Sequence, residues 1–266
     1  MSIKDIKNRI KSIKNIGQIT KAMGLVSATK LQKMRTEYES SRQFFYELDK
    51  IAENIPSKKY SEPKNKNCII LISSNRGLCG TYNINVSKMA IDLYNKKKDS
   101  AMIVIGSSAK EILKRNNIHI DKLFEAANYN FDSDFTRAIA NEALSYYENG
   151  YEIYIAYTKF FSAMKFIPEY KKVLPLAFSN SKFIFEPDPG FVMDNFISNF
   201  LSFSILNALI ESCVCEQSAR MMSMNAASDN AAQIISDLKL KFNMLRQNQI
   251  TQELTEIISG ANALKN

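Results

Sequence analysis

The segment of this sequence with the residues best suited to binding a small ligand is 73–80, SSNRGLCG. It follows an apolar run and precedes a helical pattern, which is where α/β proteins often hold phosphate on backbone N–H groups. However, it matches neither G-x-G-x-x-G nor G-x-x-x-x-G-K-[ST], and it lacks the lysine that a P-loop places on the β and γ phosphates. A nucleotide site and a tight strand-to-helix turn are both open, and the missing lysine favours the turn.

A second candidate for chemistry is His119, the one histidine of the chain. It lies in the alternating segment 118–121 with no obvious nucleophile nearby, and the carboxylates of the chain are scattered without a paired motif. We therefore expect His119 to be a surface or sheet-edge residue. These patterns predict no catalytic residue, no cofactor site and no metal site.

The four cysteines are Cys68, Cys79, Cys213 and Cys215. They lack C-x-x-C spacing, and a single histidine cannot complete a Cys/His zinc site. On a helix, Cys213 and Cys215 would point about 200° apart, which makes a disulfide between them implausible. We expect buried thiols of a reducing compartment.

Positive charge is concentrated at the start of the sequence. The formal net charge is +8, and residues 1–35 carry nine lysine and arginine side chains against one acidic side chain. Lysines three or four positions apart form a stripe along this segment: Lys4, Lys7, Lys11 and Lys14. Such a stripe predicts an acidic partner surface, which could belong to a protein, a nucleic acid or an anionic lipid.

Aromatic side chains are concentrated in residues 154–166. They could stack on the bases of a nucleic acid, or they could pack the core of a small sheet. We favour core packing. The residues are Tyr154, Tyr157, Phe160, Phe161 and Phe166.

The prolines divide the chain into a helix, a mixed body and a second helix. All six lie between positions 56 and 189, and a proline inside a helix costs about 3 kcal/mol or more. We therefore predict an N-terminal helix over 1–56, a connection over 57–67, a central α/β domain over 68–187 and a C-terminal helix over 188–266.

The N-terminal segment has apolar residues at helical spacing. They are Ile3, Ile6, Ile10, Ile13, Ile16, Ile19, Met23 and Val26. This spacing predicts a helical seam that packs against another helix, in a helix that ends near Ile55. Gly17 and Gly24 either weaken this helix or permit a neighbour to approach closely.

The C-terminal segment begins with a helix start signal, in which Asp188 suits the N-cap and Pro189 the first helical position. Two repeats of coiled-coil spacing follow: Ile235, Leu238, Phe242 and Leu245, then Leu254, Ile257, Ala261 and Leu264. The repeats are out of phase, so the polar run 246–249 predicts a change in the face that meets a partner. Antiparallel pairing of the two terminal helices is the simplest topology, and a parallel oligomer is the alternative.

The middle of the chain alternates between strand and helix patterns. We predict strands over 68–73, 101–105, 151–157 and 183–185, and helices over 81–98, 107–115 and 131–149. This order predicts a small doubly wound, Rossmann-like sheet covered by helices. The fold class is therefore α/β, with a long antiparallel coiled coil of the terminal helices.

Four segments resemble the gamma subunit family of F-type ATP synthases. They are 13–23 (IKNIGQITKAM), 73–80 (SSNRGLCG), 216–225 (EQSARMMSMN) and 245–260 (LRQNQITQELTEIISG). The resemblance spans effectively the full length, and the terminal motifs are highly specific. Residues 99–170 match in layout more than in wording.

The resemblance implies a central rotor shaft without catalytic residues or cofactors of its own. In that family the paired helices stand inside the hexamer of alpha and beta subunits, and the body sits on the membrane c-ring beside the epsilon subunit. Turning the asymmetric shaft forces the catalytic beta subunits through different conformations, so that proton or sodium flow drives ATP synthesis. Association with the membrane would be indirect.

The resemblance also implies contact residues. Met23 would lie where the shaft meets an acidic loop of beta, and Arg246, Gln247 and Thr251 where it meets a catch loop of beta. Glu186 would fall in the region that contacts the c-ring on the epsilon side. The neighbouring Phe183 and Phe185 replace tyrosines that are common in relatives, which puts hydrogen bonds from those hydroxyl groups in doubt.

The alternatives to a rotor shaft are a coiled-coil scaffold, a basic nucleic-acid-binding protein and an enzyme that uses the central body. No stretch reaches the roughly 18 uninterrupted apolar residues of a membrane span, and neither a signal core nor a presequence precedes the first helix. We therefore expect a peripheral protein on the cytoplasmic face of a bacterial inner membrane, with an organellar inner membrane as the alternative.

Overall fold

The computed structural model describes residues 2–53, 66–97, 99–125, 131–176 and 189–263. Its helices are α1 Ile3–Glu53, α2 Tyr82–Tyr94, the 3-10 turn η1 Ser107–Ala109, α3 Lys110–Arg115, α4 Ser133–Glu148 and α5 Pro189–Ala263. Its strands are β1 Lys66–Ile72, β2 Asp99–Ile105, β3 Lys122–Phe124, β4 Tyr151–Ser162 and β5 Lys165–Leu174.

The predicted secondary structure is largely confirmed. Helices occupy both ends of the chain, and the second one begins at Pro189 as its start signal predicts. The predicted strands near 68–73, 101–105 and 151–157 are β1, β2 and β4. The predicted strand over 183–185 and the N-cap Asp188 lie outside the described residues.

Two strands of the structure, β3 and β5, were not predicted from the sequence. β3 has only three residues, and β5 contains Pro168 together with lysines that hide its alternation. β5 is an edge strand that pairs with β4 alone in the sheet order β3-β2-β1-β4-β5. Proline is tolerated there because an edge strand leaves one side of its backbone unpaired.

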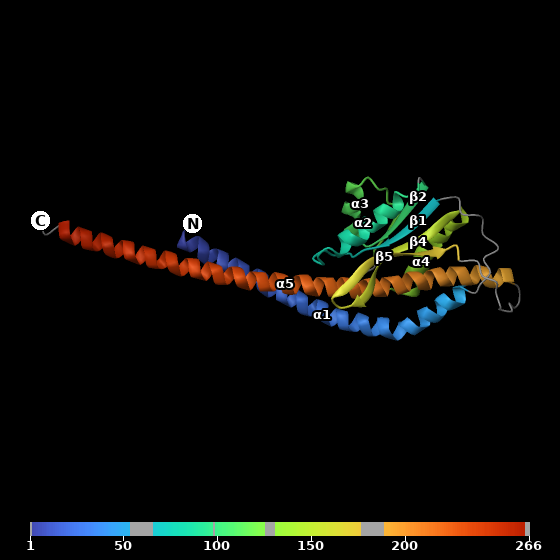
Figure 1. Ribbon diagram of the computed structural model, residues 1–266, viewed down its shortest axis with the longest axis horizontal. Helices are drawn as coiled ribbons and strands as arrows, with labels where there is room; N and C mark the ends of the chain where they lie inside the picture. The colour runs from blue at the N-terminus through green and yellow to red at the C-terminus, as the bar shows by residue number, and fades with distance from the viewer. Residues whose placement is uncertain (1, 54–65, 98, 126–130, 177–188, 264–266) are drawn as a thin grey trace. The chain divides into compact units, whose positions relative to one another are not determined.

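The sheet is a doubly wound layer with helices on both faces (Figure 1). β3, β2, β1 and β4 are parallel to one another, and β5 is antiparallel to β4. One apolar core joins α2 and α3 to the sheet. A second core joins α4, α5 from Ile197 to Leu209, and the end of α1 to the opposite face. Residues such as Ile69 and Ile70, adjacent in β1, therefore pack into different cores.

The contacts divide the chain into two units, one of residues 1–26 with 221–266 and one of residues 27–220. Both long helices contribute to both units. The predicted domain boundaries at 56, 67 and 187 remain a prediction, and positions 56 and 187 lie outside the described residues.

In the unit of residues 1–26 and 221–266, the two helices pack antiparallel. Gly24 lies beside Asn225, Gly17 lies beside Ala231, and the ammonium of Lys7 lies 5.6 Å from the ring centre of Phe242. The predicted first repeat of α5 is confirmed as part of this seam. Its members Ile235, Leu238, Phe242 and Leu245 are all half-buried.

The α1 side of this seam differs from the prediction. Ile16, Ile19 and Val26 are 52%, 59% and 56% exposed, so they do not face α5. The other members of the predicted seam are buried or half-buried: Ile3, Ile6, Ile10, Ile13 and Met23. Gly17, Thr20 and Gly24 are buried or half-buried too, and they continue the heptad spacing of the first four. A β-carbon on Gly17 would lie only 3.3 Å from the β-carbon of Ala231. The glycines therefore set the seam because they let the backbones approach.

Within residues 27–220 the helices also run antiparallel. The ring of Phe44 in α1 meets Phe203 in α5 edge to face, with ring centres 5.4 Å apart, and the hydroxyl of Tyr38 donates to Glu211 Oε1 at 3.5 Å. One stretch of α5 within 195–260 is long and apolar enough to cross a membrane, but 72% of it is buried in this protein. A helix that is buried in the core of a folded domain has the same length and apolar composition.

A buried carboxylate stabilises the amino end of the sheet. Glu152 in β4 binds Lys172 at 2.6 Å through Oε1 and Lys97 through Oε2, and it accepts the Tyr154 hydroxyl at 3.1 Å. Burial opposes ionisation of this carboxyl, but the hydrogen bonds and charges of Lys172 and Lys97 outweigh it and lower the pKa of Glu152 to about 2. The carboxylate therefore ties β4 to β5 and to the turn after α2.

We predict that Gly17→Leu destabilises the helix pair by about 1–3 kcal/mol, because the added side chain overpacks the contact with Ala231. Amide hydrogen exchange of residues 3–26 and 221–245 would measure the loss. Gln18→Leu, one position along on the exposed face, is the matched control. Equal protection in the two variants would contradict the close approach at Gly17.

We predict that Glu152 makes stability depend on acid. Its folded pKa lies below the unfolded value, so its contribution is complete above about pH 4.5 and is lost as pH falls toward 2. Glu152→Gln should lower the free energy of unfolding at pH 7 by about 1–3 kcal/mol and should flatten its decline between these pH values. Urea titrations of both proteins across this range would test it, and parallel declines would show the assignment to be wrong.

Candidate functional site

The crevice at the carboxyl ends of β1 and β2 is the first place to look for a ligand, because doubly wound sheets bind ligands there. Segment 73–80 leaves β1 at this point. Ser73 donates through its hydroxyl to Ile105 O at 3.1 Å and to Gly106 O at 3.0 Å. Gly106 has φ +92°, and a β-carbon there would lie 2.3 Å from Ser73 O, so only glycine fits.

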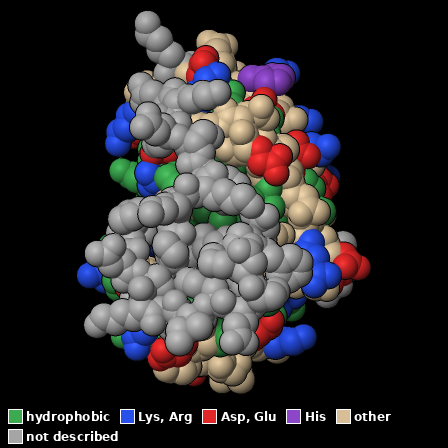
Figure 2. Space-filling view, turned by 90° about the vertical axis from the view of Figure 1, so that its right-hand side faces the viewer, with side chains coloured by type: hydrophobic (Ala, Val, Ile, Leu, Met, Phe, Trp, Pro, Cys, Tyr) green, Lys and Arg blue, Asp and Glu red, His purple; other side chains and the backbone are tan. Residues whose placement is uncertain are grey.

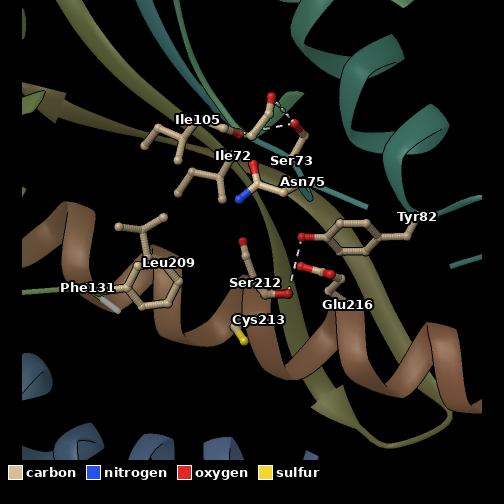
Figure 3. A pocket seen from close by; sticks show the side chains of 11 residues that line it. Ile72, Ser73, Asn75, Tyr82, Ile105, Phe131, Leu209, Ser212, Cys213 and Glu216 are labelled. Atoms are coloured by element: carbon tan, nitrogen blue, oxygen red, sulfur yellow. Dashed lines mark hydrogen bonds between the residues drawn. The ribbon is translucent and has the colours of Figure 1, made fainter. Parts of the chain in front are cut away.

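Helix α5 fills this crevice (Figure 3). Ser212, Cys213 and Glu216 line it from the helix side, and the hydroxyl of Tyr82 donates to Ser212 O at 3.2 Å. The space left is about 20 Å³, which is room for about one water molecule. A nucleotide could not enter unless α5 left the sheet.

The loop after β1 also presents the wrong groups to an anion. Arg220 of α5 donates through Nη2 to Arg76 O at 2.9 Å and to Gly77 O at 3.3 Å, and it pairs with Glu216 at 2.7 Å. Carbonyl oxygens of the loop therefore point to the buried guanidinium. Phosphate would need N–H groups there.

The turn is closed by its own side chains. Ser74 N–H donates to Asn83 Oδ1 at 3.0 Å, and Asn83 Nδ2 donates to Cys79 Sγ at 3.2 Å. Leu78 and Gly80 have positive φ angles of 63° and 58°. The loop is thus a tight strand-to-helix turn that holds α5, and the structure supports the second of the two interpretations of its sequence.

The titratable residues singled out by the sequence do not converge. His119 is exposed, and the one purple side chain of Figure 2 lies on the surface. All four cysteines are buried and free. Burial raises the pKa of the thiols of Cys68, Cys213 and Cys215, which keeps them protonated and unreactive at neutral pH. Among the described residues, no three His, Cys, Asp or Glu side chains lie together to hold a metal ion.

The aromatic cluster of 154–166 belongs largely to the fold. Tyr157 is buried in the core, and Phe160 and Phe166 pack against Cys79, Tyr82 and Cys215. Phe161 is exposed. On the face shown in Figure 2, acidic and basic side chains lie next to one another among the residues that are not grey.

The predicted contact residues lie on the two long helices. Met23 is half-buried on α1, one residue before the seam position Gly24. Arg246, Gln247 and Thr251 are exposed on α5, where the Thr251 hydroxyl donates to Gln247 O at 3.0 Å. Glu186 lies outside the described residues.

The end of α5 runs past its partner helix. The register that pairs Gly24 with Asn225 and Gly17 with Ala231 places Ile3, the first residue of α1, beside Arg246. All side chains of 246–260 are exposed. Within the described residues the predicted second repeat is not a seam, since Leu254 and Ile257 are 55% and 67% exposed; the side chains of Ala261 and Leu264 lie outside them.

A second apolar stripe lies on the outer face of α1. It consists of Ile16, Ile19 and Val26, all more than half exposed. The four lysines of the basic stripe are exposed as well. The spacing of Ile16, Ile19 and Val26 had indicated a seam, and only the paired structure shows that this apolar surface faces away from α5.

These surfaces can bind but do not assemble a reaction centre. Exposed apolar side chains on a helix cost free energy unless a partner covers them. The candidate site is therefore the surface of the helix pair and of the projecting end of α5. It comprises the lysine stripe and the apolar stripe that follows it along α1, and Ile250, Leu254, Ile257 and Ile258 on α5.

Comparison with known proteins agrees with this interpretation. A family model described as ATP synthase matches residues 2–264. The chain is 36% identical to the ATP synthase gamma chain of Clostridium perfringens over 98% of both chains. It is 37% identical to the ATP synthase gamma chain of Lachnoclostridium phytofermentans over 99% of both.

Solved structures share the fold. A chain from the mitochondrial ATP synthase of Euglena gracilis, solved with OSCP, F1 and the c-ring, superposes with a TM-score of 0.79 at 16% identity, covering 98% of this chain and 94% of that one. A chain from the central stalk and c-ring of the Tetrahymena thermophila mitochondrial enzyme gives a TM-score of 0.68 at 24% identity, covering 79% of this chain and 99% of that one.

Proposed function

Because the chain belongs to the ATP synthase gamma chain family, we propose that it is the central rotor shaft of an F-type ATP synthase. In this role its rotation couples ion flow through the membrane c-ring to conformational cycling of the catalytic beta subunits. The observation that carries the proposal is the long helix pair, whose outer apolar side chains and projecting α5 end are exposed in the described part of this chain.

The partners follow from this role. The alpha and beta subunits would surround the helix pair, and the epsilon subunit and c-ring would bind the body. Apolar side chains that are exposed in the free chain, such as Ile19 and Leu254, suit a sleeve that must let the shaft turn. Scattered apolar contacts are non-directional, so they resist rotation less than fixed hydrogen bonds do.

The chain itself would catalyse no reaction. The crevice where a doubly wound sheet would hold a nucleotide contains Ser212, Cys213 and Glu216 of α5, and the buried thiols are protonated. Nucleotide chemistry would belong to the beta subunits. We further propose that the complex lies on the cytoplasmic face of a bacterial membrane, which is supported by bacterial relatives such as that of Clostridium perfringens.

The proposed contacts divide between the two helices. Met23 on α1 would meet an acidic loop of beta, and the lysine stripe further toward the start of the same helix would complement acidic charge of the partner. Arg246, Gln247 and Thr251 would meet the catch loop of beta from the projecting end of α5. Glu186 would contact the c-ring on the epsilon side.

Reconstitution with alpha and beta subunits tests the proposed function directly. We expect the chain to co-purify with them and their multisite ATP hydrolysis to depend on it. Assembly without any effect on hydrolysis would favour a scaffold. ATP turnover by the isolated chain, or salt-sensitive binding to DNA without assembly, would support the enzyme or the nucleic-acid-binding protein instead.

We predict that Arg246→Ala lowers ion-coupled ATP synthesis by about tenfold, which is what losing one charged hydrogen bond costs. The fold should stay intact because Arg246 is exposed. Circular dichroism would check the fold, and ATP synthesis in membrane vesicles would measure the coupling. Arg115→Ala, at the end of α3, is an exposed control. Wild-type synthesis by the Arg246 variant would rule out this contact.

A further inference from the structure

The strand β4 extends beyond its neighbour in the sheet. The register of β1 and β4 ends where Leu71 meets Ala156, and β1 stops at Ile72, whereas β4 continues to Ser162. β5 pairs with the other edge of β4 along this extension. The edge of β4 that faces β1 therefore carries backbone groups that no strand satisfies beyond Ala156.

Side chains of α5 take the place of the missing strand. Phe160 N–H donates to Glu211 Oε1 at 2.9 Å, and Thr158 N–H donates to Ser212 Oγ at 3.4 Å. Thr158 and Phe160 are two positions apart, so their N–H groups point to the same edge of the strand. Adjacent residues of one helix thus bond alternate residues of one strand.

The same edge is bonded through its carbonyl groups. Cys215 Sγ donates to Thr158 O at 3.3 Å, and Ser218 Oγ donates to Ala163 O in the turn between β4 and β5. Together with Glu211 and Ser212, these side chains cover two turns of α5, and all four are buried. Because these four donors and acceptors lie on buried side chains of the helix, water competes little for the bonds, and the bonds favour one position and one rotation of the helix.

Apart from the apolar packing of its last turns in the core, helix α1 is attached to the sheet by weaker polar and aromatic contacts. Asp49 pairs with Lys171 of β5 at 2.6 Å, but their side chains are 41% and 39% exposed, and such surface pairs contribute about 0–1 kcal/mol. The ring of Tyr38 packs edge to face on Phe160 with ring centres 5.9 Å apart. These contacts permit more sliding than buried, directional hydrogen bonds.

We propose that the free edge of β4, sealed by α5, is the joint through which torque passes between the body and the shaft, and that Glu211 is its main positioning residue. The proposal rests on the proposed rotor function. It implies that α5 carries the load from the body, while α1 supports α5 along its length. Glu211 has this part because its carboxylate is the acceptor of the shortest of the backbone N–H bonds and also accepts the hydroxyl of Tyr38.

The test compares rotors in the complex reconstituted with alpha and beta subunits. Glu211→Gln keeps an acceptor oxygen, Glu211→Leu removes it at similar volume, and Asp49→Asn breaks the pair of α1 as a matched control. With the hexamer fixed and a bead attached to α3, thermal fluctuations of the bead report the torsional stiffness of the rotor. Amide exchange of Phe160 in each free chain reports the bond itself.

We expect Glu211→Leu to speed Phe160 exchange by about tenfold and to reduce the torsional stiffness, while Glu211→Gln and Asp49→Asn stay close to wild type. Faster exchange with unchanged stiffness would overturn the proposal, and so would an equal loss of stiffness in Asp49→Asn. If Glu211→Leu does not assemble, the double variant Ser218→Ala/Glu211→Gln replaces it in the test, because it removes another bond to the same edge of β4. Reduced torsional stiffness of this variant would support the proposal, and unchanged stiffness would overturn it. A wild-type chain that does not assemble with alpha and beta would instead refute the rotor function.

Discussion

The structure depends on the burial of one stretch of α5 against the sheet. From Ile197 to Leu209 this helix packs its apolar side chains into the core beneath β1, β2 and β4. From Glu211 to Arg220 it replaces that apolar packing with buried polar side chains that bond the backbone of β4 and of the loop after β1. A helix held in both ways can neither slide nor rotate on the sheet.

This constraint also explains why the doubly wound sheet binds no nucleotide in our interpretation. The crevice at the carboxyl ends of β1 and β2 is the usual ligand position of such sheets, and here it holds Ser212, Cys213 and Glu216. The loop that would cradle phosphate turns its carbonyl groups toward Arg220. The position where such sheets usually bind a ligand is thus occupied by helix α5. A helix fixed in this way suits a protein with a mechanical role.

The helix pair of residues 1–26 and 221–266 follows a different principle. Gly17 and Gly24 bring α1 close to α5, which leaves Ile16, Ile19 and Val26 on the outside. The pair is stabilised by a narrow heptad seam, and its outer apolar face remains available to a surrounding partner. Since α5 continues past the first residue of α1, its end offers single-helix surface.

The sequence by itself determined the elements. The confinement of prolines to positions 56–189 and the 3 and 4 spacing of apolar residues gave two long helices, and the apolar runs gave β1, β2 and β4, because these signals are local. The sequence did not reveal β5, because its proline is acceptable only in an edge strand. It also did not reveal that Gly17 and Gly24 belong to the seam of α1, because a glycine contributes to such a seam only when another backbone lies against it. The tertiary structure decided these points, together with the hydrogen bonds by which α5 covers the free edge of β4. Each depends on which distant residues meet, and the periodicity of a sequence carries no information about contacts between distant residues.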